Sequence, residues 1–312
     1  MTSTLTASRL GGRCRGPHGP RARPRVRSIT RTLPLLPALV LLVVFLVGPI
    51  VSSFYGSLTN GSLTGPAAAQ SSFVGLKNYT DLFKSPDFPV SVLLTLVFVL
   101  LSAVVGQNAV GMILALLLRN GNRIVGTIVS TIVVGAWVLP EIVAAFASYA
   151  FFSTHGTLNG LLRVVGVTGP NWLYTFPMFA VIAANAWRGT AFSMLMYSAA
   201  LKDVPSEIMD AAAIDGASVP KRFLYVTLPM IRRTISTNML LTTLWTLSVF
   251  TLIYVMTLGG PGNKSMTLPV LAYQEAFKFS KLGYGTAIAT VLLLVGGVFA
   301  VVYTRMLKPE VD

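Results

Sequence analysis

Six long apolar runs, separated by polar segments, dominate the pattern along the chain. Each run is near or above the ~20 residues that a helix needs to cross the hydrocarbon core of a bilayer. The runs cover residues 33–55, 90–118, 124–151, 176–201, 233–257 and 284–306. The pattern therefore predicts an all-α membrane protein with six transmembrane helices.

Composition supports this prediction, because only 11% of the 312 residues are charged and 54% are hydrophobic. A soluble domain carries about 25% charged residues. The net charge of +14 fits a membrane protein better than a nucleic-acid-binding one, since lysines and arginines collect on the cytoplasmic side of membranes. Of the 24 lysines and arginines, 17 fall on the side of the N-terminal tail, six on the other side, and Arg188 within a span. This distribution predicts that both termini are cytoplasmic.

The two ends of the chain differ from the apolar part between them. Residues 1–32 carry eight arginines and little that is apolar. Such a segment cannot bury a core, so a disordered cytoplasmic tail is predicted, which either anchors the topology or contacts anionic lipid headgroups. The first apolar run is too long, and its flank too basic, for an ordinary cleaved signal peptide. Residues 33–307 are predicted to form the membrane domain and residues 308–312 a cytoplasmic end.

No motif for self-contained catalysis occurs in the sequence. The segment 259–265 approaches a phosphate-binding loop, but Asn263 stands where that loop needs a glycine before the lysine. A His-Glu-x-x-His zinc motif and a Gly-x-Ser-x-Gly elbow are both missing. Cys14 is the single cysteine, and the two histidines, His18 and His155, are far apart. An enzyme is therefore disfavoured, and neither a metal nor a cofactor is expected on this chain.

The longest interior loop, residues 203–232, is rich in alanine where a surface loop normally carries charge. Asp203 and Pro205 suit the first turn of a helix, and Gly216 is placed to end or bend it. Ser218 then suits the cap of a second short helix, with Pro220 just inside it. From composition alone, two interpretations are equally open. The loop is either an amphipathic connector lying on the bilayer or a knob that fits a groove in a partner protein.

The motif in this loop resembles the cytoplasmic signature of ABC importer permeases. Asp210-Ala211-Ala212 with Gly216 is similar to the family's Glu-Ala-Ala, three residues, Gly pattern, and Leu228-Pro229 follows at the family's spacing. Asp215-Gly216-Ala217-Ser218 resembles the carbohydrate-importer branch. Four outer segments are also similar to sugar permeases of the maltose or glycerol-phosphate first-permease type, and the resemblance covers about residues 33–307. They are 73–79, 156–162, 187–188 and 258–262.

The resemblance implies a type I importer permease fold with a short cytoplasmic coupling helix. It implies a second homologous permease, two ATPase subunits that carry ATP and Mg, an external solute-binding protein and a sugar or sugar derivative as partners. The location implied is the plasma membrane of a bacterium or archaeon. Contact with the ATPase is implied for residues 205–229, and Asp210 keeps the charge of the family's glutamate on a shorter side chain. The residues matched to the signature are Asp210, Ala211, Ala212, Asp215, Gly216, Leu228 and Pro229.

Polar residues inside the spans are the candidates for a substrate pathway. Arg188 and Glu141 fall at similar depth, so they either pair as a brace between helices or contact solute. Amides hydrogen-bond sugar hydroxyls and aromatic rings stack on pyranose faces, although interhelical bonding and packing explain such residues equally well. The further candidates are Gln107, Asn108, Asn185, Trp187, Trp245 and Tyr254.

An ion-coupled secondary transporter or channel is the alternative function. Such a protein needs acidic residues within its spans as ion sites. Glu141 is the single acidic residue that falls in an apolar run, which argues against a proton relay. The identity of the sugar does not follow from these motifs.

Overall fold

The computed structural model describes residues 35–307, so the predictions for the arginine-rich tail and for residues 308–312 lie outside the described part. Contacts divide the chain into two units, which meet between Ile50 and Val51. The first unit holds Leu36–Leu42 (α2), Val43–Val47 (η3, a π-helical turn) and the start of Gly48–Ser57 (α3), which continues into the second unit. The large apolar side chains of α2 and η3 are exposed, as expected for a helix surrounded by lipid.

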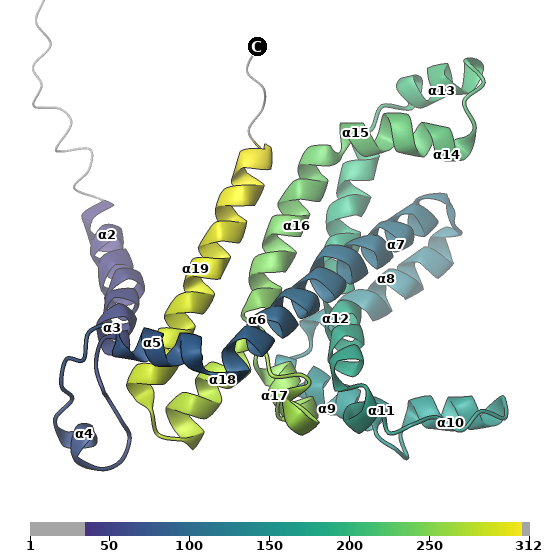
Figure 1. Cartoon of the computed structure of the whole chain (residues 1–312). Helices are drawn as coiled ribbons and strands as arrows, with labels where there is room; N and C mark the ends of the chain where they lie inside the picture. The colour runs from purple at the N-terminus through teal and green to yellow at the C-terminus, as the bar shows by residue number, and fades with distance from the viewer. Residues whose placement is uncertain (1–34, 308–312) are drawn as a thin grey trace, which may run out of the picture. The chain divides into compact units, whose positions relative to one another are not determined.

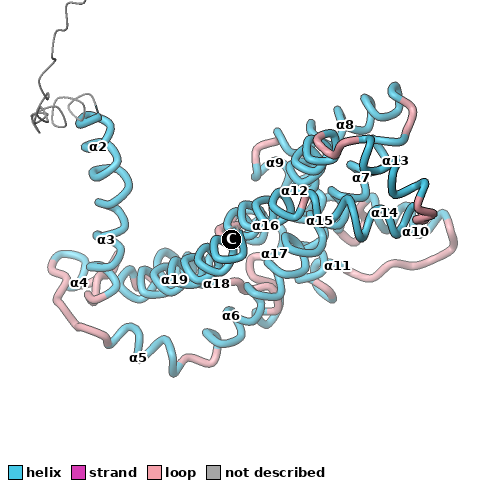
Figure 2. Tube along the Cα trace, turned by 90° about the horizontal axis from the view of Figure 1, so that it is seen from above, coloured by secondary structure: helices cyan, strands magenta, loops and turns pink. Residues whose placement is uncertain are grey.

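Helices also build the described part of the second unit, and the single β-bridge there joins Thr59 to Phe73 (Figure 1, Figure 2). The η labels mark π-helical segments, except η6, which is a 3-10 turn. The elements are α4 Pro66–Ala69, α5 Lys77–Lys84, α6 Asp87–Phe98, η4 Val99–Gln107, α7 Asn108–Asn120, α8 Arg123–Val138, α9 Glu141–Phe152, α10 Thr157–Val164, α11 Trp172–Thr175, α12 Pro177–Lys202, α13 Ser206–Ile214, α14 Val219–Arg222, η5 Phe223–Thr227, α15 Leu228–Met230, α16 Arg232–Leu247, α17 Thr251–Thr257, η6 Pro261–Asn263, α18 Leu268–Tyr273, η7 Gln274–Lys278 and α19 Leu282–Leu307.

Three helical stretches are long and apolar enough to cross a membrane as they stand: Leu36–Ser57, Asp87–Arg119 and Leu282–Arg305. Two pairs of helices are bent, and each pair adds one further span if its two helices together are counted as a single span. The 26 residues of α12 reach ~39 Å, which is long enough to cross, but α12 is not among these three stretches. Six spans therefore remain a prediction.

The expected spans 124–151 and 233–257 are not continuous helices. α8 and α9 meet at 109°, because Pro140 has no N–H to donate and forces the preceding Leu139 to ψ 137°. α16 and α17 meet at 50°. There the N–H groups of Ser248 and Val249 bond three residues back, to the carbonyls of Trp245 and Thr246, which tightens and ends α16.

α12 is the central helix of the second unit and contacts η4, α7, α8 and α16 (Figure 1, Figure 2). Glycines allow the closest of these approaches. A Cβ on Gly111 would lie 2.5 Å from the Cβ of Ser193, and one on Gly106 would lie 2.9 Å from that of Ala186. Small residues at such positions let backbones pack closely, which is how helices associate in lipid.

Candidate functional site

The two helix breaks open into one cavity of about 280 Å³, here called the break cavity. Four elements or junctions contribute to it: the end of η4, the α8–α9 break, the middle of α12 and the α16–α17 break. Its lining residues are Gln107, Trp137, Glu141, Asn185, Arg188, Gly189, Trp245, Thr246, Ser248 and Val249. Five of the eight pathway residues predicted from the sequence are therefore brought together here: Gln107, Glu141, Asn185, Arg188 and Trp245.

Glu141 joins the two breaks. It is the first residue of α9, and its Oε1 accepts a hydrogen bond of 3.2 Å from the backbone N–H of Leu252, in the first turn of α17. Since α9 and α17 pack against each other, one carboxylate serves the N-termini of two neighbouring half-helices. A negative group is stabilised there by the positive ends of both helix dipoles.

Arg188 lines the same cavity without a partner. Among residues 35–307 the one ion pair described is Lys281–Glu275, so the Arg188–Glu141 pair, one of the two alternatives that the sequence left open, does not form. The Arg188 Nε is buried and makes no hydrogen bond. Arg188 therefore has no partner through which it could brace two helices. Glu141 does link two helices, α9 and α17, through its bond to the Leu252 N–H.

The two amides of the break cavity hold helices together at its wall. The Gln107 Nε2 donates to the Asn185 carbonyl at 3.2 Å and to the Thr246 Oγ1 at 3.4 Å. The Asn185 Nδ2 donates to the Ser102 Oγ at 2.8 Å. Gly189 makes room for this arrangement, because a Cβ there would lie 2.2 Å from the Gln107 Cδ. Gln107 and Asn185 are thus placed by interhelical bonds and still border the cavity.

An aromatic group forms another part of the wall. The Trp245 and Phe192 rings meet edge to face, with centroids 4.7 Å apart, and Trp137 lies 6.0 Å from the same Phe192. Sequence reasoning missed Trp137, which looks like one more apolar residue in a span. Its position three residues before Pro140 was the available signal, since proline interrupts helices and transporters place binding sites at discontinuous helices.

Asn108, a predicted pathway residue, lies in a different place. It belongs to a buried polar network between α7, α12 and α16. The Asn108 Oδ1 accepts from the Asn238 Nδ2 at 2.8 Å and from the Tyr197 hydroxyl, and Asn238 also donates to the Ser193 Oγ at 2.9 Å. Asn108 is therefore an interhelical brace that does not line the break cavity, and a role for it in the substrate pathway stays a prediction. Sequence reasoning missed Asn238, which is fully buried.

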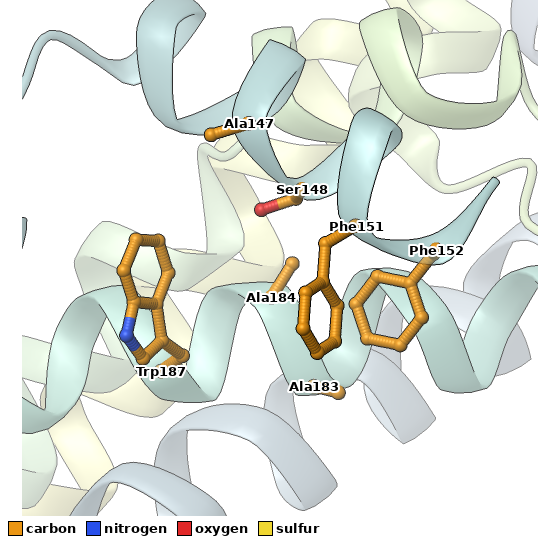
Figure 3. A pocket seen from close by; sticks show the side chains of 7 residues that line it. All are labelled: Ala147, Ser148, Phe151, Phe152, Ala183, Ala184 and Trp187. Carbon is orange, nitrogen blue, oxygen red and sulfur yellow. The ribbon is translucent and has the colours of Figure 1, made fainter. Parts of the chain in front are cut away.

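Trp187 and Tyr254 also lie away from the break cavity. Trp187 lines an apolar pocket of about 470 Å³ together with Phe151 and Phe152 (Figure 3), and Arg188 does not line that pocket. Tyr254 packs between Phe250 and Tyr273, with ring centroids 5.1 and 5.0 Å away. Both residues pack with other aromatic or apolar groups, which is the packing interpretation that the sequence left open.

The alanine-rich loop forms two helices outside the bundle (Figure 1). α13 ends in a Schellman motif, in which the N–H of Ala217 bonds to the carbonyl of Ala212 and the N–H of Gly216 to that of Ala213. Gly216 has the required left-handed φ of 76°, so its predicted role as a helix end is confirmed. Pro205 precedes α13 as its cap and is not in its first turn, which corrects the prediction.

The second helix of the loop runs from α14 through η5 to α15. Ser218 caps it as predicted, although its side chain makes no capping bond. Leu228 and Pro229 lie in its last turn, and Ile231 begins the turn into α16. Met209 of α13 packs on a buried cluster that includes Ile231, and the Thr227 hydroxyl contacts its sulfur at 3.5 Å. The loop is thus anchored to the bundle at one side.

The other side of the loop exposes apolar residues. Ile214 is 87% exposed, Val219 69% and Tyr225 77%. Asp210 and Asp215 are also exposed, and the structure describes no ion pair for either. An exposed surface of this mixed character fits contact with another protein.

Residues 107–312 match the sequence family described as the binding-protein-dependent transport system inner membrane component. The chain belongs to this family. Relatives that align over most of their length support this membership. The trehalose/maltose transport system permease protein MalF of Thermococcus litoralis is 31% identical, over 88% of this chain and 92% of its own. The sulfoquinovosyl glycerol transport system permease protein SmoG of Agrobacterium fabrum is 31% identical, over 88% and 89%.

Solved structures show the same fold. A bacterial ABC transporter involved in alginate import has a chain that superposes with a TM-score of 0.72 at 19% identity, covering 92% of this chain and 98% of its own. A chain of the alginate transporter in complex with an alginate pentasaccharide-bound periplasmic protein superposes equally well, at 20% identity. The predicted importer permease fold is therefore confirmed. The protein is the membrane permease component of an ABC importer, and in this family ATP hydrolysis belongs to a separate subunit.

Proposed function

We propose that this permease forms half of the translocation pathway of an ATP-driven sugar importer, in the plasma membrane of a bacterium or archaeon with both termini cytoplasmic. Names of relatives support the substrate class. Permeases for trehalose/maltose, sulfoquinovosyl glycerol and lactose are 29–31% identical to this chain.

The break cavity is the observation that carries the proposal. Discontinuous helices in transporters place helix ends and irregular backbone at the binding site. Here two breaks meet, and the cavity between them is bordered by a guanidinium, two amides and the indole of Trp245. Such groups suit a sugar, because donors and acceptors match its hydroxyls and an indole packs on its apolar face.

Coupling to the ATPase is assigned to residues 205–229. The Ala211 and Ala212 side chains are small enough for close approach, and Asp210 and Asp215 offer negative charge to basic groups of a partner. Because Met209 fixes α13 to the end of the bundle, closure of an ATPase pair would move α13 and the attached ends of α12 and α16 together. Leu228 and Pro229 transmit this motion at the turn into α16.

The complete importer would contain a second homologous permease, two ATPase subunits that bind ATP and Mg, and an external solute-binding protein. Among residues 35–307 no group of three or more acidic, histidine or cysteine side chains is placed to hold a metal ion. The ion-coupled alternative is disfavoured because the Glu141 carboxylate is engaged by the Leu252 N–H.

Reconstitution tests this function. The chain, co-purified with its partner permease and ATPases and placed in vesicles, should take up a labelled sugar only with ATP inside and the binding protein outside. A panel of glycans offered to the binding protein identifies the sugar. Uptake that persists without the ATPase, or that follows an ion gradient, would refute the proposal.

A further inference from the structure

A third cavity, also of about 470 Å³, lies where the end of α7, the start of α8 and the end of α12 come together. Figure 1 shows the α7–α8 turn on the same side of the bundle as α13. We call it the basic cavity, because Arg119, Arg123 and Lys202 line it and no acidic residue does. The three cations come from three different helices, so their convergence depends on the fold.

None of these cations is neutralised by the described part of the chain. The ion pair Lys281–Glu275 is elsewhere, and Asp203, which follows Lys202, makes no pair. The Ser198 Oγ, also in the cavity wall, is buried without a hydrogen-bond partner. Three positive charges and one uncommitted hydroxyl thus surround a space large enough for a ligand, and the uncompensated charge selects an anion.

The walls indicate what kind of anion fits. Leu118, Leu195 and Leu201 line the cavity beside the cations, and Leu195 is 43% exposed. Next to Arg123 on α8, Ile124 and Val125 are 71% and 58% exposed. An apolar wall that runs into an exposed apolar helix surface suits acyl chains, while cations gathered at the ends of helices suit a headgroup.

We infer that the basic cavity binds the headgroup of an anionic phospholipid. The headgroup phosphate would accept bonds from the two guanidinium groups, the Lys202 ammonium and the Ser198 hydroxyl, with its acyl chains along α8. Basic pockets between the ends of transmembrane helices bind such headgroups. The bound lipid would tie the α7–α8 turn to the end of α12, four residues before α13 begins.

The test counts bound lipid on the purified importer complex by native mass spectrometry, after exposure to mixed micelles of phosphatidylglycerol and phosphatidylcholine. Wild-type protein should retain phosphatidylglycerol selectively. Each of Arg119→Gln, Arg123→Gln and Lys202→Gln should lower this retention about fivefold. Ser198→Ala should lower it up to about tenfold without loss of stability, because the hydroxyl has no bond to lose within the protein.

The control is the double variant Arg232→Gln, Arg233→Gln. It removes two positive charges, against one in each cavity variant, from the first turn of α16 and touches no residue of the basic cavity, so it should retain phosphatidylglycerol. The inference is overturned if this control loses as much lipid as the cavity variants. It is also overturned if wild-type protein retains both lipids equally, or if excess inorganic phosphate displaces phosphatidylglycerol, which would make the cavity an ion site.

Discussion

The Glu141 carboxylate accepts the backbone N–H of Leu252 at 3.2 Å, and this one bond links the two places where spanning helices break. Glu141 begins α9 and Leu252 lies in the first turn of α17. This bond therefore joins the α8–α9 break to the α16–α17 break at the wall of the break cavity.

Removing the charge of Glu141 should therefore loosen both half-helices. Glu141→Gln keeps an oxygen acceptor and should lower the free energy of unfolding by about 1 kcal/mol, whereas Glu141→Ala also leaves the Leu252 N–H without its partner and should cost about 2 kcal/mol. Thermal unfolding of the purified complex and gel filtration measure stability and assembly. Glu207→Gln, an exposed acid in the first turn of α13, is the control and should change stability less. Equal stability of Glu141→Ala and wild type would contradict the bracing role.

Arg188 and Trp187 are neighbours with different surroundings and make a matched pair. Arg188→Met removes a guanidinium that has no described partner, so assembly should be unchanged while sugar uptake falls about tenfold or more. Trp187→Leu changes the wall of the apolar pocket and should affect uptake less. Initial uptake rates in vesicles give the comparison. Loss of assembly in Arg188→Met would show that the arginine braces the fold instead.

The Asn108–Asn238 bond, 2.8 Å long, is the centre of the buried network. Asn238→Ala leaves the Asn108 Oδ1 and the Ser193 Oγ each short of a donor and should destabilise the protein by about 1–2 kcal/mol. A double-mutant cycle with Asn108→Ala should give a coupling energy near 1 kcal/mol in unfolding. The reference is Thr304→Ala, whose hydroxyl bonds within its own helix on the exposed surface. A coupling energy near zero would show that the Asn108–Asn238 bond does not stabilise the fold.

Local signals were sufficient for α12 and for the end of α13. The run 176–201 predicts α12, which is Pro177–Lys202, because helix ends follow the polar flanks of an apolar run. Gly216 marks the end of α13 because a left-handed residue favours glycine whatever surrounds it. The bend at Ser248 carries no proline or glycine, so it depends on tertiary contacts that the sequence pattern does not contain.

Only half of the residues that line the break cavity were predictable, because tertiary contacts also decide which side chains reach it. Successive residues of a helix point about 100° apart, so Gln107 and Asn108, or Trp187 and Arg188, face different neighbours. Polarity selects both members of each pair as candidates. Only the packing of α12, including the space that Gly189 leaves for Gln107, decides which member reaches the cavity.

Gly216 offers the sharpest test of the coupling helix, because its φ of 76° is the sole reason it must be glycine. A Cβ there would meet nothing within 4 Å, so Gly216→Ala adds backbone strain of about 1 kcal/mol without a clash. Strain at the Schellman motif should disturb the end of α13. Uptake in vesicles should then fall severalfold while the complex still assembles, and Gly216→Asp, which adds a charge at the proposed docking surface, should abolish uptake.

Gly135 is the control for this substitution. It lies inside α8, where a Cβ also meets nothing within 4 Å, but its backbone is helical. Gly135→Ala should therefore be neutral or stabilise the protein by up to about 1 kcal/mol, with normal uptake. ATP hydrolysis and uptake measured on the same vesicles separate loss of coupling from loss of assembly. Normal uptake by Gly216→Asp would refute the assignment of residues 205–229 to ATPase contact, since the strained, charged end of α13 could not then be part of the docking surface.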